Sequence, residues 1–592
     1  MTAARLPILV PIGAGASVLA PAFACAVALA LGLASAPAVA ARVGPGESIL
    51  EAPRAVAASD LILRIQRALS AVGLYQGRAD GIMGPETEAA IRAYQRMSGL
   101  AVTGQPTQAL ADRLDAGDKV DELLSKLDKA RAENIKAARA ALLANPATRD
   151  LISDELAERT DPTRDVAPCL KTPTAACLLA EAVESSKAVA DRELRDWSLG
   201  EILVAEARAG LTRNARDTAR RIRDPRLIVV ALRDIAEAQA QGGFAAEALA
   251  AAETIPDSLK RAEALAAIAA IHAARGRDAA ARAAAARLSA TLDDLTEPTQ
   301  QVAFRARLAV VLAAADNAAG ATSALTAAEA AARELPAAQK GTALRQVAVA
   351  LAEVRRTGEA LRLLNDIPDK ADHIPVLTAA VVREARGDNP ATAHALAATI
   401  ADGHHRAGVL GPVAAAQRRA GNRAAAERTL AAALAATDEI PYPFAKSYAL
   451  SRIALALDDI AGDEKSGIAR RDYFARAASV AEQIGDDSLR ALSLWTVAAT
   501  ASRAGGDGLV RVLEARADRA TQDIKSRLDR AWMLGDIAMA RARLGEAPAA
   551  KAAFRRGLDT AAEIENAWGR ARAFARLALV LMQIDDQPGS QR

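Results

Sequence analysis

The sequence predicts an all-α protein, because alanine dominates its apolar residues, glycine recurs at a regular interval and strand patterns vanish beyond Leu178. Hydrophobic residues make up 51% of the 592-residue chain, but aromatic residues only 3%. Alanine is the best helix former, and its small side chain lets helices pack closely. The chain is also longer than one hydrophobic core usually supports. We therefore expect a small N-terminal domain followed by a long α-solenoid of helical hairpins.

The charge balance argues against a nucleic-acid partner. The chain holds 75 basic and 72 acidic residues, for a formal net charge of +3. Recognition of nucleic acid by electrostatics needs basic residues clustered on one surface. No such cluster stands out in the sequence, so we expect no nucleic-acid partner.

The N-terminus has the pattern of an export signal. Arg5 is the only charged residue before Arg42, and the residues between them are almost all apolar or small. We predict a signal peptide over residues 1–40, cleaved after small residues near Ala40, with a linker over 41–59. The alternative is a retained membrane anchor, although Pro11, Pro21 and Pro37 interrupt the stretch. The sequence thus predicts a periplasmic protein that contacts the membrane only if the signal is not cleaved.

The cysteines fit an oxidising compartment. Cleavage would remove Cys25, whose preceding residues depart from the usual lipoprotein signal, and would leave Cys169 and Cys177. We predict a disulfide between these two, worth roughly 2 to 3 kcal/mol; the alternative is a pair of buried thiols. No histidine lies near them, so we expect no metal and no cofactor.

Residues 60–115 combine apolar stripes with closely spaced turn residues. Leu61, Ile65 and Leu69 lie at helical spacing, and Asp80-Gly81 is a strong turn dipeptide. Pro85 suits the first position of a second helix. The pattern predicts three short helices separated by tight turns.

These residues resemble the small three-helix peptidoglycan-binding domain family. The resemblance implies noncatalytic attachment to peptidoglycan or, in some members, recognition of other polymers or a regulatory role. The motif residues expected to act mainly in the structure are Gly77, Gly81, Gly84, Ala90, Tyr94, Gln95, Gly99, Leu100 and Gly104. Ile65-Gln66, Asp80 and Thr87 also fit the family pattern, with Tyr75 at its aromatic place.

Five polar or aromatic residues beside the turns are the candidates for touching the ligand. Tyrosine offers a flat face for packing against a sugar, and arginine can pair with the carboxylates of stem peptides. Asp80 also suits a purely structural role as a turn cap. The candidate peptidoglycan-binding residues are Tyr75, Arg78, Asp80, Thr87 and Arg92.

A connector follows over residues 116–177. Charged residues alternate with apolar ones from Asp118 to Asn145, which predicts one long amphipathic helix ended by Pro146. The helix could serve as a spacer, a coiled coil or the cap of the repeat array. Prolines punctuate the remainder of the connector, so we expect the boundary between the two regions within it.

Residues 178–585 carry the repeat signal, with a short tail at 586–592. Paired alanine-rich helical stretches recur with a glycine between them, and several units resemble the tetratricopeptide repeat from that glycine onward. Ile255-Pro256-Asp257 and Ile367-Pro368-Asp369 are predicted turns between units. The recurring glycines are Gly210, Gly243, Gly276, Gly320, Gly358, Gly387, Gly421, Gly462, Gly505 and Gly545.

No catalytic constellation is apparent. The chain has five histidines, and none forms a spaced pair of metal ligands. Helical repeats also occur in lytic transglycosylases, but a separate catalytic domain is missing. Between residues 245 and 441 the only aromatic residue is Phe304, which argues against a sugar-binding groove there. We expect no catalytic residues.

Together these patterns predict an exported, noncatalytic peptidoglycan-binding scaffold whose solenoid binds an unidentified envelope protein. One alternative is a regulator or subunit of a peptidoglycan-remodelling enzyme complex. Another is an unrecognised cell-wall hydrolase, which turnover of purified wall would reveal.

Overall fold

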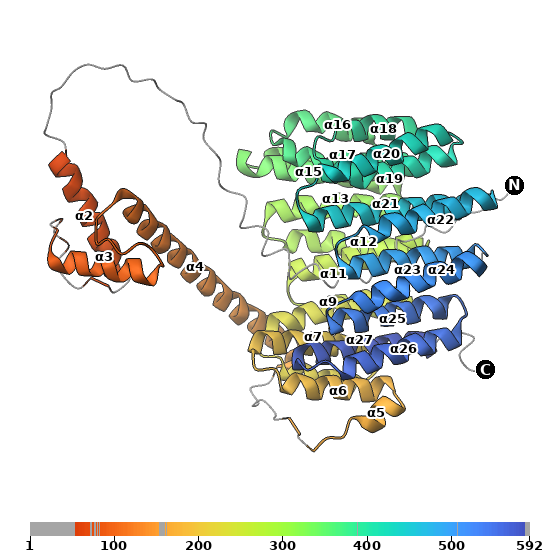
Figure 1. The fold of residues 1–592 in the computed structure, drawn as a ribbon, viewed down its shortest axis with the longest axis horizontal. Helices are drawn as coiled ribbons and strands as arrows, with labels where there is room; N and C mark the ends of the chain where they lie inside the picture. The colour runs from red at the N-terminus through yellow and green to blue at the C-terminus, as the bar shows by residue number, and fades with distance from the viewer. Residues whose placement is uncertain are drawn as a thin grey trace. The chain divides into compact units, whose positions relative to one another are not determined.

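The computed structural model describes residues 54–585, apart from residues 72–73, 76–78, 80, 82, 153–159, 162, 388 and 506. The predicted signal peptide, residues 41–53 of the linker and the tail lie outside these residues. None of the described residues is in a strand, so the predicted all-α class is confirmed. The described chain forms two units, over residues 54–137 and 138–585 (Figure 1). No described helix is long and apolar enough to cross a membrane.

The first unit is built from three helices: α2 (Arg54–Ala71), α3 (Pro85–Met97) and α4 (Gln108–Ala144). The sequence predicted a third short helix and then a separate connector helix, which is wrong. A single helix covers both segments, because Gly117 adopts helical geometry and no proline interrupts the chain before Pro146. α4 therefore begins inside the first unit and ends in the second.

The second unit repeats one motif, a pair of antiparallel helices joined by a tight turn. Short 3₁₀ turns lie between some of them: η2 (Arg149–Leu151), η3 (Leu292–Asp294), η4 (Leu364–Asp366) and η5 (Lys370–Asp372). The consecutive hairpins are α7 (Arg192–Arg208) with α8 (Thr212–Arg221), α9 (Pro225–Gly242) with α10 (Ala245–Glu253), α11 (Ser258–Ala274) with α12 (Asp278–Thr291), α13 (Pro298–Ala314) with α14 (Ala318–Glu334), α15 (Ala337–Glu353) with α16 (Thr357–Leu363), α17 (His373–Arg386) with α18 (Pro390–Ala398), α19 (Gly403–Arg419) with α20 (Arg423–Asp438), α21 (Pro443–Asp463) with α22 (Gly467–Glu482), α23 (Asp487–Arg503) with α24 (Asp507–Asp523), and α25 (Arg527–Arg543) with α26 (Ala547–Ala562).

Most of the recurring glycines lie in the turn within a hairpin. At six of these turns glycine takes a positive φ, which favours a residue without a side chain. Gly320, Gly358 and Gly462 instead lie inside helices, so their predicted place between helices is wrong. In the turns from α13 to α14 and from α15 to α16 the positive φ falls on Asp316 and Arg355 instead.

The turn from one hairpin to the next carries a signature that the glycine pattern did not show. A buried isoleucine precedes the capping residue, and its carbonyl oxygen accepts a hydrogen bond from the side chain six residues later. Both predicted Ile-Pro-Asp turns have this form, and Asp257 accepts a bond from the backbone N–H of Lys260. The donor and acceptor pairs are Arg261 with Ile255, His373 with Ile367, Arg406 with Ile400, Arg490 with Ile484, Arg530 with Ile524 and Arg570 with Ile564.

The hairpins form two layers. Each odd-numbered helix from α7 onward packs on the next odd-numbered helix, up to α25 on α27 (Ala567–Asp585). The even-numbered helices pack mainly on their own hairpin partners, and none packs extensively on the next even-numbered helix in the described chain. The inner layer of a curved array has the shorter path, so neighbouring helices lie closer together in it than in the outer layer. The odd-numbered helices pack on one another along the array and therefore form the inner layer.

The array closes into a ring. α27 packs on α7, and it pairs with α6 (Ala175–Lys187) as the other inner helices pair with their outer partners. The last hairpin is thus made of the C-terminal helix and a helix from before the first hairpin, side by side in Figure 1. The described residues contain eleven such hairpins. The predicted solenoid of hairpins is confirmed, and its closure was not predicted.

Arg572 of α27 joins the two ends of the array of hairpins. Its guanidinium forms two hydrogen bonds of 2.8 Å with the carboxylate of Glu201 on α7. The same group lies 5.2 Å from the ring centroid of Trp197, 4.7 Å from Trp532 and 4.5 Å from Trp568. Only 4% of Arg572 is exposed. A buried arginine held by a bidentate carboxylate and aromatic faces makes a strong, geometrically specific closure.

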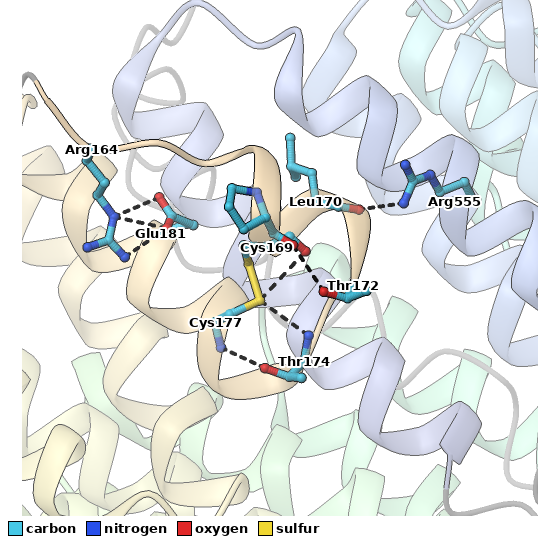
Figure 2. The surroundings of a disulfide bond; sticks show 9 residues. Arg164, Cys169, Leu170, Thr172, Thr174, Cys177, Glu181 and Arg555 are labelled. Atoms are coloured by element: carbon cyan, nitrogen blue, oxygen red, sulfur yellow. Dashed lines mark hydrogen bonds and ion pairs between the residues drawn. A yellow bond between two sulfur atoms is a disulfide. The ribbon is translucent and has the colours of Figure 1, made fainter.

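A disulfide lies beside this closure (Figure 2). Cys169 of α5 (Ala167–Lys171) is bonded to Cys177 of α6. The hydroxyl oxygen of Thr174 caps α6 by accepting from the backbone N–H of Cys177. The guanidinium of Arg555, from α26, donates to the carbonyl oxygen of Leu170. The disulfide therefore fixes α5 where it contacts the C-terminal hairpins.

Candidate functional site

The first unit has a small apolar core between its three helices. Its buried side chains come from all three, and Tyr75 joins them from the turn after α2. Leu61, Leu74, Met83 and Tyr94 are partly buried against this core. The buried set is Ile65, Ala68, Leu69, Tyr75, Ala90, Ile91, Leu110, Ala111 and Leu114.

Gln66 is a buried polar residue that fixes the turn between α2 and α3. Its side-chain oxygen accepts from the backbone N–H of Gly81 at 2.8 Å. Its amide nitrogen donates to the hydroxyl oxygens of Thr87 at 3.0 Å and Tyr75 at 3.3 Å. Gln66 itself is fully buried. One glutamine thus ties the turn to both helices, which explains why glutamine stands at this motif position.

Gln95 does the same for the turn between α3 and α4. Its side-chain oxygen accepts from the backbone N–H groups of Thr103 and Gly104, both at 2.9 Å. Its amide nitrogen donates to the hydroxyl of Thr103 at 3.0 Å. Gly104 has φ +71°, and a Cβ there would meet the Arg92 side chain. This turn therefore needs both the glutamine and the glycine.

The predicted binding residues fall in three kinds of place. Tyr75 and Thr87 are buried, with 7% and 1% of their surface exposed, and both bond to Gln66. Arg92 is exposed and pairs with Glu88 at 2.7 Å on the same face of α3. Arg78 and Asp80 lie outside the described residues, as does Gly77. A ligand role for these residues stays a prediction, and burial of Tyr75 and Thr87 favours packing for those two.

The remaining motif residues take positions that suit structural roles. Gly81 and Gly99 have positive φ, at 75° and 66°. Gly84 precedes Pro85 as the residue before α3, and Ala90 is a buried residue within that helix. Leu100 is partly buried after the helix ends.

The exposed surface of this unit combines apolar and charged groups. Met97 and Val102 are 73% and 42% exposed at the end of α3 and in the turn that follows. Across the helices, Arg64 of α2 pairs with Asp115 at 2.6 Å and Asp112 at 3.3 Å on α4. These exposed groups lie outside the family motif, whose described residues are mostly in the core and the turns.

Residues 59–114 match the sequence family of peptidoglycan binding domains. These residues form a peptidoglycan-binding domain. The match covers most of α2, all of α3 and the start of α4, and the long all-helical region follows it. We call residues 59–114 the wall-binding domain from here on.

Two solved structures show a faint likeness to parts of the chain. Ton1535 from Thermococcus onnurineus NA1 is 16% identical, with a TM-score of 0.26, over 57% of this chain and 97% of that one. A circular tandem repeat protein with novel repeat topology and enhanced subunit contact surfaces is 12% identical, with a TM-score of 0.16, over 90% of this chain and 97% of that one. No curated protein matches the chain. At these scores the ring is established by its own helix packing alone.

The ring also holds carboxyl groups with raised pKa. Burial raises the pKa of Asp458 on α21 to about 7, although the hydroxyl of Thr500 donates to it at 2.8 Å. Burial likewise raises the pKa of Glu206 on α7 to about 7. Glu206 lies beside Thr218 of α8, its own hairpin partner, whereas Asp458 lies between α21 and α23. α7 and α21 do not pack extensively on each other in the described chain, so the two carboxyl groups do not form an acid and base pair.

Proposed function

We propose that this chain is an exported, noncatalytic anchor, in which the wall-binding domain holds peptidoglycan and the ring presents a surface to another envelope protein. The observation that carries the proposal is the wall-binding domain over residues 59–114, with its core and both of its glutamine-fixed turns intact. Such a domain would attach whatever follows it to the wall.

A location outside the cytoplasm is supported by the disulfide. Cys169 and Cys177 are bonded to each other. Disulfides persist in oxidising compartments such as the periplasm and are rare in the cytosol. The apolar N-terminus, which lies outside the described residues, is the export signal in this proposal.

The scaffold role is supported by the outer layer of the ring. Ile468 on α22 and Val512 on α24 are 86% and 55% exposed. Large exposed apolar side chains on a repeat surface suit contact with a protein partner. A noncatalytic role is supported by the seclusion of Asp458, which is 4% exposed and bonded to Thr500.

Sedimentation with insoluble purified peptidoglycan tests the proposal. Protein beginning at residue 42 is compared with a variant that lacks residues 54–107, and soluble fragments released from the wall are monitored. We expect the first to sediment, the second to sediment much less and no fragments to appear. Sedimentation that the deletion leaves undiminished would overturn the anchoring role, and released fragments would overturn the noncatalytic one.

A further inference from the structure

One stripe of α21 faces the lumen of the ring. Its residues are spaced by four, four, three and four positions, which places them on one side of a helix. α21 packs on α19, α22 and α23, and the rest of the helix buries its side chains against these neighbours. The stripe is not buried, and it lies opposite the outer partner α22. The lumen stripe consists of Phe444, Tyr448, Arg452, Leu455 and Asp459.

The first part of the lumen stripe is aromatic and open. Phe444 is 71% exposed and Tyr448 is 48% exposed. His404 of α19 lies beside them, with its ring centroid 5.9 Å from that of Tyr448. Phenylalanine, tryptophan and tyrosine together make up only 3% of this chain, so two of them one helical turn apart beside a histidine ring are a marked concentration. Exposed aromatic faces of this kind indicate a ligand surface.

The next part of the lumen stripe is basic. Arg452 follows Tyr448 by one helical turn, and Arg383 and Arg386 lie near the end of α17. None of these arginines forms an ion pair with any residue that the structure describes. Burial and the neighbouring Asp463 raise the pKa of Asp459, while Arg419, Arg452 and Arg386 oppose that rise, which places these charged groups near one another.

The size of the lumen limits what can enter it. Eleven inner helices spaced about 9 Å apart give a circular ring an opening on the order of 20 Å once side chains are subtracted. A folded domain of about 100 residues is wider than that. The opening suits an extended polymer.

We propose that the lumen stripe binds a glycan strand of peptidoglycan, with sugar rings on Phe444 and Tyr448 and stem-peptide carboxylates on Arg452 and Arg386. The apolar faces of sugars pack on aromatic rings, and the unpaired arginines complement the negative charge of the stem peptides. This rests on the proposed function, because the wall-binding domain would bring strands to the ring. It gives the ring a second, independent contact with the same polymer.

The test uses the full chain and soluble, uncrosslinked glycan strands that carry stem peptides. Affinity is measured by calorimetric titration, and hydrogen exchange of the first turns of α21 locates the contact. We expect strands to slow exchange there, and the Phe444→Ala/Tyr448→Ala variant to weaken the ring's affinity for strands about tenfold and abolish that protection. Arg452→Ala should weaken binding of these strands severalfold, but not of strands stripped of their peptides.

Phe244→Ala is the matched control, because Phe244 is 59% exposed in a hairpin turn away from the lumen. It should leave affinity and exchange unchanged. Unchanged exchange in the first turns of α21 when strands are added to the native chain would overturn the proposal, as would full affinity in the double variant. Protection of α21 by an unfolded polypeptide but not by strands would reassign the surface to a peptide partner.

The two proposals fail in different ways. The double variant keeps the wall-binding domain, so it should still sediment with insoluble wall. Loss of the anchoring role would show as sedimentation that ignores deletion of residues 54–107, whereas loss of the present proposal shows only at α21.

Discussion

The wall-binding domain and the ring reach a defined structure by different means. Among its described residues the domain buries nine apolar side chains in its core, and two glutamines, Gln66 and Gln95, fix its turns. The ring repeats one helical hairpin, so nearly every contact has counterparts in other hairpins, except where Arg572 joins the two ends. Individual polar residues should therefore matter throughout the domain, but in the ring mainly at the closure.

Arg572→Ala should have the largest effect. It leaves the carboxylate of Glu201, which is 20% exposed, without its bidentate partner and opens a space between three tryptophans. We expect a loss of about 3 to 5 kcal/mol in the free energy of unfolding of the ring, the usual cost of breaking a buried ion pair. Tryptophan fluorescence during denaturation with urea measures it, because three of the four tryptophans surround the arginine.

Arg576→Ala is the control for this variant. Arg576 lies one turn further along α27 and pairs with Asp536 at 2.7 Å, in a partly exposed place. Its loss should cost about 1 kcal/mol or less. Equal losses in the two variants would mean that Arg572 has no special place in the ring.

Gln66→Ala should affect only the domain. The change removes the bonds to Gly81, Thr87 and Tyr75 and leaves a buried N–H group without its acceptor. We expect a loss of about 3 kcal/mol, large for so small a core. Hydrogen exchange should show faster exchange in α2 and α3 and unchanged exchange in the ring. The exposed Gln108→Ala should change neither region.

Cys169→Ser/Cys177→Ser should weaken the closure moderately. Removing the disulfide frees α5 from α6, and the chain-entropy model puts the loss at about 2 to 3 kcal/mol. Reduction of the native protein should lower the thermal midpoint of the ring by the same amount as the double variant. A reducing agent that shifts the midpoint of the double variant as well would show that its effect does not pass through this bond.

Asp458→Asn should stabilise the ring at neutral pH. Burial raises the pKa of Asp458 to about 7, from 3.8 when unfolded, so the carboxyl favours folding when protonated and this contribution is lost as the pH rises from about 4 to 7. Asparagine stays neutral and can still accept from Thr500. The variant should gain roughly 2 kcal/mol at pH 7.5 and almost nothing at pH 4. A gain that is equal at both pH values would contradict the burial of Asp458.

The domain could be predicted closely because its signals are local. Gly81, Gly99 and Gly104 mark positive-φ turns that their neighbours in sequence already indicate. The sequence could not reveal which side chains point inward. Tyr75 and Thr87 lie beside a turn, where side chains are often exposed, but both are buried and accept hydrogen bonds from Gln66. The glutamine itself was the missed signal: a polar residue within an apolar stripe needs buried partners.

In the ring, the local elements could be predicted from the sequence, but the long-range contacts could not. Helices and hairpins followed from alanine content and glycine spacing, but the closure joins residues 371 positions apart, as in the pair of Arg572 with Glu201. No local pattern specifies such a contact. The lumen stripe was hidden for a related reason: low aromatic content between residues 245 and 441 argued against sugar binding, yet Phe444 and Tyr448 follow that segment directly. A search for exposed aromatics at a spacing of four would have found them.

Hydrogen exchange of α27 tests the closure of the ring most directly. The native chain is compared with a variant that lacks residues 164–187. This deletion removes α5 and α6, which precede the first hairpin and are distant in sequence from α27. If the ring closes as described, exchange should accelerate in α27, nearly 400 residues away, while hairpins on the opposite side such as α15 with α16 keep their protection. Unchanged protection of α27 in this variant would contradict the closed ring and leave an open array of hairpins.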